Sequence, residues 1–265
     1  MEKMEHHVPI IELFGFKFDL SAILMILVTS LAVLILAVSA SRKASMTNPS
    51  KLQNFMEWAV EFVENIIGST IGSKYGKPFI TLGLTLIMFI FIGNMLGLPF
   101  SFITEHKDVA SATIAGHPFL TSADFADAAA KGQHEIGVSW WKSPTADIAV
   151  TGALTAIVIL LSHFLGLTRN TKHYIAHYFE YKGTMLILHL IEVVSKPLTL
   201  AFRLYGNIYA GEIMISVIVG AGYFGILPLI AWQGFSVFVG AIQAFVFTML
   251  TMVYISQTLV HEEQH

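Results

Sequence analysis

Long apolar runs alternate with shorter polar stretches along this chain. A helix that crosses a bilayer needs about 20 mostly apolar residues. Five segments are long enough, at 20–41, 79–103, 147–168, 184–220 and 226–260. The pattern therefore predicts an all-α membrane protein with five transmembrane helices, and we expect the whole chain to form a single integral membrane domain.

The polar stretch after the first span has a helical period of its own. Between 50 and 70, eight apolar residues recur at a spacing of three or four: Leu52, Phe55, Met56, Ala59, Phe62, Val63, Ile66 and Ile67. Three glutamates, Glu57, Glu61 and Glu64, fall between them. An amphipathic pattern of this kind predicts a helix that lies on the membrane surface rather than crossing the bilayer.

Basic residues concentrate in two of the polar stretches. Segments 42–78 and 169–183 together hold eight lysines and arginines, whereas 104–146 holds five acidic residues and three basic ones. Because cytoplasmic loops carry the excess of Lys and Arg, both basic segments are expected in the cytoplasm, and with them the 50–70 helix. The N-terminus is then outside and the C-terminus cytoplasmic. The transmembrane hairpin 79–168 carries the 104–146 loop on the outside.

The last two spans are too long for an upright crossing. At a rise of about 1.5 Å per residue, 184–220 would measure about 55 Å and 226–260 about 50 Å, against a hydrocarbon core of about 30 Å. Either these helices break or they are steeply inclined. Pro197 could bend the first of them, although membrane helices tolerate proline. With a turn near 220–225, we expect 184–260 to form a long inclined hairpin.

The fourth apolar segment contains a permanent charge. Arg203 is too far from either end of that helix to reach the interface easily, and a charge at the bilayer centre costs about 2.5–3.5 kcal/mol even on the mildest scale. Glu212 points roughly the opposite way along the same helix. Four other polar residues fall within about 40° of Arg203 on a helical wheel: His189, Glu192, Lys196 and Asn207. We therefore expect a partner or an ion pathway at Arg203.

The last helix carries a matching stripe. Four residues recur at every seventh position: Ser236, Gln243, Leu250 and Gln257. In an antiparallel hairpin, Gln243 would lie at about the level of Arg203. Simpler roles stay open for other positions. Ser236 and Gln257 could simply form contacts between helices. Asn94 could cap or bridge helices in the second span. Lys196 could reach toward the membrane interface.

The mixture of side chains on the Arg203 face indicates how protons could move. Glutamate and histidine bind and release protons, whereas arginine effectively stays charged. A titratable stripe interrupted by Arg203 is therefore not a continuous proton wire. It is typical of two half-pathways separated by a fixed cation, which favours the ionised form of a carboxylate brought next to it. If that carboxylate belongs to a moving carrier, ion flow is coupled to movement.

Composition supports a membrane protein and excludes several other classes. Of the 265 residues, 55% are hydrophobic and 12% charged, and that charged fraction is about half the value usual for a soluble domain. A net charge of −3 is not the basic character that nucleic acid attracts. There is no cysteine, so disulfides and Cys-ligated metals are excluded. The glycines before Pro78 do not have phosphate-loop spacing, so we expect no bound nucleotide. We also expect no cofactor and no metal.

Five stretches resemble subunit a of bacterial F-type ATP synthases. They are NPSKLQNFMEWAVEFV at 48–63, NMLGLPF at 94–100, WWKSPTADIAV at 140–150, RLYGNIYAGE at 203–212 and IQAFVFTMLTMVY at 242–254. The resemblance covers the whole chain, and the paired Arg and Gln motifs at this spacing are highly specific. It implies the membrane-sector stator of a rotary motor, in a multi-pass protein of the bacterial plasma membrane.

The resemblance also implies a mechanism. Ions, expected to be protons, would cross through two offset half-channels at the interface with the rotating ring of c subunits, and this flow would drive ATP synthesis elsewhere in the complex. Arg203 matches the essential arginine that engages the ring carboxylate and blocks a leak between the half-channels. Gln243 matches the glutamine that faces it, and Asn207 and Glu212 match polar residues of the ion path. The chain itself would be non-catalytic.

The resemblance also implies binding partners and the residues at the mouths of the two half-channels. The implied partners are the c-ring, the peripheral-stalk b subunits, the rest of the ATP synthase and membrane lipid. The candidates for the inner half-channel are His189, Glu192 and Lys196, and those for the outer half-channel are Asp147, Ser236 and Asn94. Some relatives have histidine where Ser236 stands and glutamate where His189 stands, so the relay groups at each mouth are left open.

Two other classes of protein fit part of the pattern. A secondary transporter could bind an anionic substrate at a midplane arginine, although such transporters favour internal repeats and broken helices. A membrane metalloenzyme could use His173, His177, His189 or Glu192, but no water-activating third ligand is evident.

Overall fold

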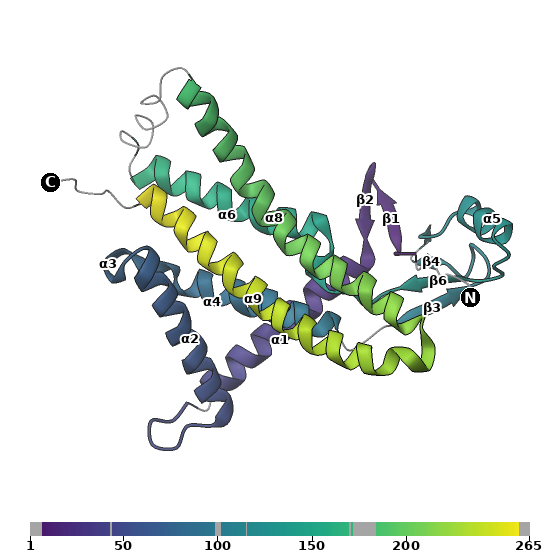
Figure 1. Ribbon diagram of the computed structural model, residues 1–265, viewed down its shortest axis with the longest axis horizontal. Helices are drawn as coiled ribbons and strands as arrows, with labels where there is room; N and C mark the ends of the chain where they lie inside the picture. Colours follow the sequence, from purple (N-terminus) through teal and green to yellow (C-terminus); the bar gives the residue numbers. More distant parts are fainter. Residues whose placement is uncertain are drawn as a thin grey trace.

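Long helices make up most of the chain. The computed structural model describes residues 7–42, 44–98, 102–114, 116–169, 171 and 184–259. The main helices are α1 (Leu20–Arg42), α2 (Lys51–Thr70), α4 (Ile80–Gly97), α6 (Ile148–Arg169), α8 (Thr184–Val219) and α9 (Ile226–Leu259). In Figure 1, α8 and α9 lie side by side across the molecule, and α9 also packs against α4 and α6.

Among the described residues, four helical segments are long and apolar enough to cross a membrane: Leu20–Arg42, Lys77–Gly97, Ile148–Arg169 and Gly222–Leu259. The second begins in η1 (Lys77–Phe79), directly after the short helix α3 (Ser73–Gly76), and the fourth begins in the 3₁₀ turn η3 (Gly222–Gly225). α8 is 36 residues long, but it carries two glutamates, a lysine and an arginine. The structure is thus that of a mostly helical membrane protein, and the fifth span stays a prediction.

Four of the five predicted spans agree with the helices to within one residue at each end. The exception is the second, because α4 ends at Gly97 and not at 103, and the strand β3 (Ile103–His106) follows. Pro99 explains the early stop, since proline has no backbone N–H with which to continue the hydrogen bonds of the helix. Leu98 and Phe102 extended the apolar pattern of the sequence, but both lie outside α4. In contrast, α8 runs unbroken through Pro197.

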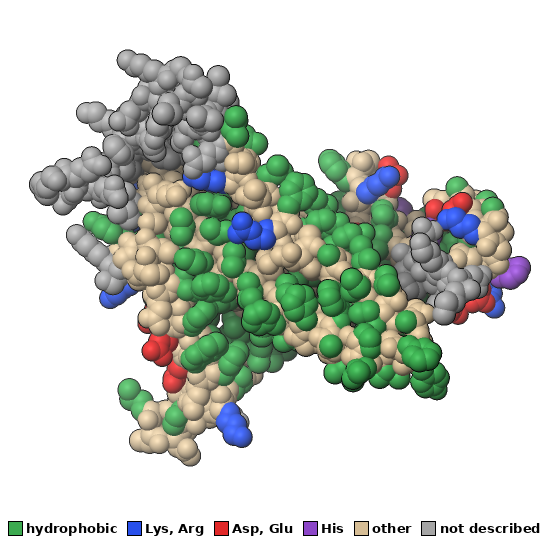
Figure 2. Space-filling view, viewed as in Figure 1, with side chains coloured by type: hydrophobic (Ala, Val, Ile, Leu, Met, Phe, Trp, Pro, Cys, Tyr) green, Lys and Arg blue, Asp and Glu red, His purple; other side chains and the backbone are tan. Residues whose placement is uncertain are grey.

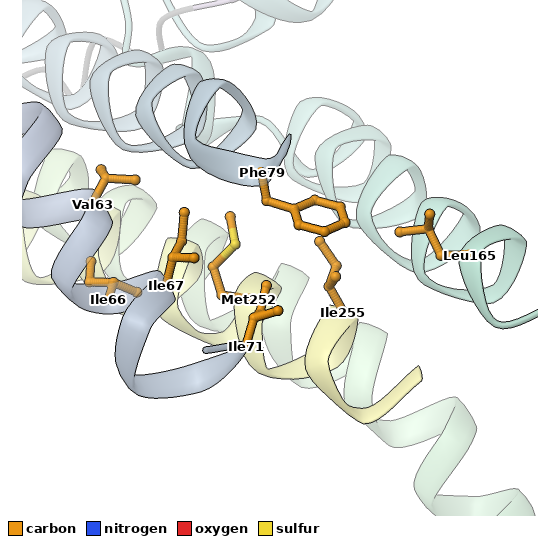
Figure 3. Close-up of a cluster of buried hydrophobic side chains, with 8 residues drawn as sticks. All are labelled: Val63, Ile66, Ile67, Ile71, Phe79, Leu165, Met252 and Ile255. Atoms are coloured by element: carbon orange, nitrogen blue, oxygen red, sulfur yellow. The ribbon is translucent and has the colours of Figure 1, made fainter. Parts of the chain in front are cut away.

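The helix predicted for 50–70 is α2, and its apolar side packs against other helices. Ser50 caps it by accepting a hydrogen bond from the Gln53 N–H at 3.1 Å. Glu57, Glu61 and Glu64 are exposed on its other side. Figure 3 shows the buried cluster that α2 shares with η1, α6 and α9, formed by Val63, Ile66, Ile67, Ile71, Phe79, Leu165, Met252 and Ile255. α2 is therefore held by the helix bundle, and its place on the cytoplasmic membrane surface stays a prediction.

The polar loop of the first hairpin is folded. With the N-terminal strands it forms what we call the cap, at the opposite end of the molecule from α2 (Figure 1). Its elements are β1 (Ile10–Leu13), β2 (Phe16–Asp19), β3, β4 (Thr113–Ile114), β5 (His117–Pro118), α5 (Ser122–Ala130) and β6 (Ile136–Ser139). The strands pair antiparallel as β1–β2, β3–β6 and β4–β5, around the buried residues Ile11, Ala112, Phe119, Leu120, Ala128, Ile136 and Val138. These small sheets add to the predicted all-α architecture.

A second buried cluster lies in the middle of the bundle. It joins α4, α6, α8 and α9 through Leu86, Ile90, Val158, Leu200, Leu204, Ala244 and Phe247. Leu204 is 1% exposed, although it directly follows the exposed Arg203. The cluster thereby fixes the rotation of α8 about its own axis and turns Arg203 out of the bundle.

Candidate functional site

Arg203 lies on the exposed side of α8. Its neighbours on that side include Phe202 and Tyr209, which are 49% and 44% exposed. Figure 2 shows that the face formed by α8 and α9 is largely hydrophobic. Among the residues that the structure describes, Arg203 forms no ion pair with a carboxylate. The guanidinium is thus a fixed charge on an apolar face.

Two contacts give the register of the antiparallel pair α8–α9. Lys196 Nζ donates a hydrogen bond to Gln257 Oε1 at 3.1 Å, and the Trp232 indole N–H donates to the Gly211 carbonyl at 3.2 Å. Arg203 lies between these two levels on α8. Interpolation places it within about one turn of Gln243 along the axis.

Gln243 and Arg203 nevertheless face different surroundings. Gln243 is 7% exposed and lies beside the buried Ala244, whereas Arg203 is exposed. No hydrogen bond joins these two described side chains. The predicted shared level is consistent with the register, and the two side chains are not hydrogen-bonded to each other.

A small cavity lies between α4, α8 and α9, at the end of the helices next to the cap. Its volume is about 40 Å³. Because a single water needs only about 10–15 Å³, the cavity has room for water. It brings together four of the predicted residues, and its polar and small lining includes Asn94, Gly97, Ser143, Asn207, Gly211, Glu212 and Ser236.

Hydrogen bonds fix the polar groups of this cavity. The Ser143 N–H donates to Glu212 Oε1 at 2.8 Å. Asn94 Oδ1 accepts from the hydroxyls of Ser143 and Thr145, while Asn94 Nδ2 donates to the Gly240 carbonyl at 3.2 Å. Asn94 therefore bridges helices, which was one of the two roles left open from the sequence, and it also lines the cavity.

Two features connect the cavity with water and with the surface. The buried Ser236 hydroxyl has no hydrogen-bond partner among the described residues, and Ser236 lines a cavity that has room for water. Asn207 lines the cavity and is also exposed. Because Asn207 is one turn from Arg203, the cavity reaches the exposed face of α8 close to the arginine.

Next to the cavity, three charged side chains form a cluster that we call the Lys142 triad. Lys142 Nζ lies 2.5 Å from Asp19 Oδ2 and 3.3 Å from Asp147 Oδ2. Burial would lower the pKa of Lys142, but the hydrogen bond to Asp19 and the two carboxylate charges hold that pKa above its usual value. Burial would likewise raise the pKa of Asp19, yet hydrogen bonds from Lys142 and Ser21 hold it below its usual value.

The predicted inner residues are placed only in part. Lys196 Nζ bonds Gln257 and lies 6.0 Å from the centre of the Tyr254 ring. The side chains of His189 and Glu192 lie outside the described part of the structure. His173 and His177, named for a metal site, also lie outside it. Among the described residues, no group of three His, Asp or Glu side chains could hold a metal ion.

The sequence pattern missed three contributors to this site. Lys142, Ser143 and Thr145 lie in the 3₁₀ turn η2 (Pro144–Ala146) and just before it. The only signal was their place in the stretch WWKSPTADIAV, between the cap and Asp147. Ser143 acts on Glu212 through its backbone N–H, which residue type does not encode.

The fold and cavity define a class of protein: a multi-pass helical membrane protein with a small polar cavity beside an exposed arginine. The model of the ATP synthase A chain family matches residues 23–256, and the chain belongs to this family. It is 42% identical to ATP synthase subunit a of Bacillus subtilis (strain 168), over 98% of this chain and 100% of that relative. It is 41% identical to ATP synthase subunit a of Listeria monocytogenes, over 98% of this chain and 100% of that relative. The chain is thus a bacterial membrane protein.

Proposed function

We propose that this chain carries protons across the membrane through two offset half-channels at its interface with a ring of c subunits, and that this flow drives ATP synthesis. The observation that supports the proposal best is the cavity between α4, α8 and α9. It gathers Asn94, Asn207, Glu212 and Ser236 and reaches the exposed face close to Arg203.

The cavity is the inner end of the outer half-channel in this proposal. Protons enter from the cap side, which is outside, past Asp147 and reach Glu212 in the cavity that Ser236 also lines. They leave the cavity past Asn207 to the exposed face of α8, where a ring carboxylate takes one up. Glu212 lies nine residues from Arg203, or about 13 Å along the helix, so the two groups serve different steps.

Arg203 separates the two half-channels. An exposed arginine on an apolar face is costly in lipid, and a carboxylate on the ring would pair with it. The fixed positive charge favours the ionised form of that carboxylate, so a returning ring site releases its proton. Gln243 lies behind Arg203 in the bundle and completes the polar section of the interface.

The inner half-channel opens toward the cytoplasm along the other half of α8. Lys196, paired with Gln257, lines it together with His189 and Glu192. Each elementary charge that crosses the membrane releases about 2.3 kcal/mol per 100 mV, and rotation of the ring conveys this energy to the soluble sector. The chain itself makes or breaks no covalent bond.

The remaining topology follows from the same proposal. Five spans cross the membrane as one integral domain, with the N-terminus outside and the C-terminus in the cytoplasm. α8 and α9 form the steeply inclined hairpin against the ring, and α2 lies on the cytoplasmic surface, where the b subunits of the peripheral stalk join the chain. The unbroken course of α8 disfavours the alternative of a secondary transporter, which typically uses broken helices.

The test is proton pumping by the assembled complex in membrane vesicles with Arg203→Ala. We expect ATP-driven pumping to disappear, since the variant no longer separates the half-channels. After the soluble sector is stripped, passive proton flow through the variant should persist or increase.

The matched control is Arg169→Ala, which removes an arginine from the last turn of α6 and should pump at the wild-type rate. Normal pumping by Arg203→Ala would refute the half-channel proposal and make the arginine structural.

A further inference from the structure

A lysine outside the cavity joins two membrane helices at their first residues. Asp19 caps α1, because its Oδ1 accepts the Ser21 N–H at 2.9 Å. Asp147 caps α6 in the same way, and its Oδ1 accepts the Ala149 N–H at 2.8 Å. Each carboxylate uses its other oxygen, Oδ2, to bind Lys142 Nζ. Lys142 therefore links the N-terminal caps of α1 and α6.

The residues directly after Lys142 contact the cavity. The Ser143 N–H donates to Glu212 on α8 at 2.8 Å, and the Ser143 hydroxyl donates to Asn94 on α4 at 3.3 Å. Thr145 also bonds Asn94. The 142–145 turn thus holds the ion pairs at one end and the hydrogen bonds of the cavity at the other, and it touches α1, α4, α6 and α8.

The Lys142 triad is shielded from water. The side chains of Lys142, Asp19 and Asp147 are 15%, 17% and 16% exposed. Breaking a buried pair by removing one partner leaves an uncompensated charge with little water to solvate it. Without the ammonium, two carboxylates would face each other across the turn, and their repulsion would move the turn away from α4 and α8.

We propose that Lys142 is a positioning residue of the outer half-channel, which holds the 142–145 turn so that the Ser143 N–H stays directed at the Glu212 carboxylate. The inference rests on the proposed function, in which Glu212 takes up protons from the outside. Lys142 does not line the cavity itself. It acts through Ser143 and Glu212.

The experiment is ATP-driven proton pumping by the whole complex in vesicles, normalised to the amount of this chain in the membrane. Lys142→Met keeps the length of the side chain and removes its charge, and we expect pumping to fall about tenfold. Lys142→Arg should restore at least half of the wild-type rate. The matched control is Lys107→Met, because Lys107 pairs with Glu135 at 3.0 Å in the same cap but is 76% exposed, and it should pump normally.

A double variant distinguishes a positioning role of Lys142 from a general loss of structure. In a chain that carries Glu212→Asp, the carboxylate is already displaced, so adding Lys142→Met should cost less than twofold. A further tenfold loss in that background would show that Lys142 acts independently of Glu212 and would overturn the inference. Wild-type pumping by Lys142→Met alone would also overturn it.

If Lys142→Met does not assemble, Asp19→Asn takes its place. Asparagine caps a helix as well as aspartate does, and the Lys142–Asp147 pair remains. We expect about a threefold loss of pumping, and an unchanged rate would refute the inference. The proposed function is tested separately. If Arg203→Ala abolishes pumping while the Lys142 variants pump normally, the role of Lys142 is refuted and the proposed function stands.

Discussion

At the scale of single residues, the closest approach in the site is between α4 and the 142–145 turn. A Cβ on Gly97 would lie 2.6 Å from both the backbone nitrogen and the Cβ of Ser143. Backbone atoms cannot move aside as the end of a flexible side chain can. The absence of a side chain at Gly97 is therefore what lets the turn reach Glu212.

Gly97→Ala should consequently disrupt the cavity. Overpacking of this kind costs about 1–3 kcal/mol, and the displaced turn would lose the hydrogen bond from Ser143 to Glu212. We expect proton pumping by the complex to fall at least tenfold.

The control for Gly97 is another helical glycine. Nothing lies within 4 Å of a Cβ placed on Gly152 in α6, so Gly152→Ala should pump normally and gain about 1 kcal/mol of helix stability. If both alanine variants pumped at the same rate, the close contact at Gly97 would not matter for proton pumping.

At the scale of elements, the Lys142 triad ties the start of α1 to the start of α6, and this tie depends on pH. The pKa of Asp19 is lowered by folding, so its stabilising effect is present above the unfolded value of about 3.9 and is lost as the pH falls through the folded value. The pKa of Lys142 is raised, so its effect is lost only as the pH rises above about 10.4.

Asp19→Asn measures this tie without removing the cap of α1. Hydrogen bonds to charged groups contribute about 1.5–3 kcal/mol, so the variant should unfold at a lower temperature than wild type at pH 7. The difference should be the same at pH 9. It should begin to shrink below about pH 4 and vanish as the pH falls through the lower folded-state pKa of Asp19, below which Asp19 is protonated in both states. Thermal unfolding of the purified complex across this pH range is the measurement. A difference that stayed constant down to pH 2 would contradict the assignment.

Elements also show what sequence periodicity can predict. The helices are long and strongly patterned, so their existence and most of their ends followed from the sequence. The cap did not, because its strands are two to four residues long, and one pair, β3–β6, joins distant segments, as Ile103 does with Ser139. Such pairs leave no local alternation to detect.

The site was predictable to a similar extent. Asn94, Asn207, Glu212 and Ser236 were named from their residue types and motifs, and they line one cavity. The contribution of Ser143 depends on a backbone N–H and on a turn packed against Gly97. Tertiary contacts of that kind follow only from the folded chain.

At the scale of the whole molecule, the absence of cysteine from the sequence permits a direct test of orientation. Lys107 directly follows β3 in the cap, and Lys51 is the first residue of α2. The cap and α2 lie at opposite ends of the molecule (Figure 1), so we replace each lysine singly with cysteine. In intact cells, a membrane-impermeant maleimide should label Lys107→Cys and leave Lys51→Cys unlabelled until the cells are opened. Labelling in the reverse order would invert the proposed topology.

The link between Asp19 and Lys142 also has a consequence for biosynthesis. The two residues are 123 positions apart, and translation at about 5–20 residues per second separates their appearance by about 6–25 seconds. During that interval α1 is already made, but its capping carboxylate has no lysine to bind. The first helix must therefore enter the bilayer as an independent unit. Its final placement is set only when the hairpin 79–168 has been inserted and the cap closes over it.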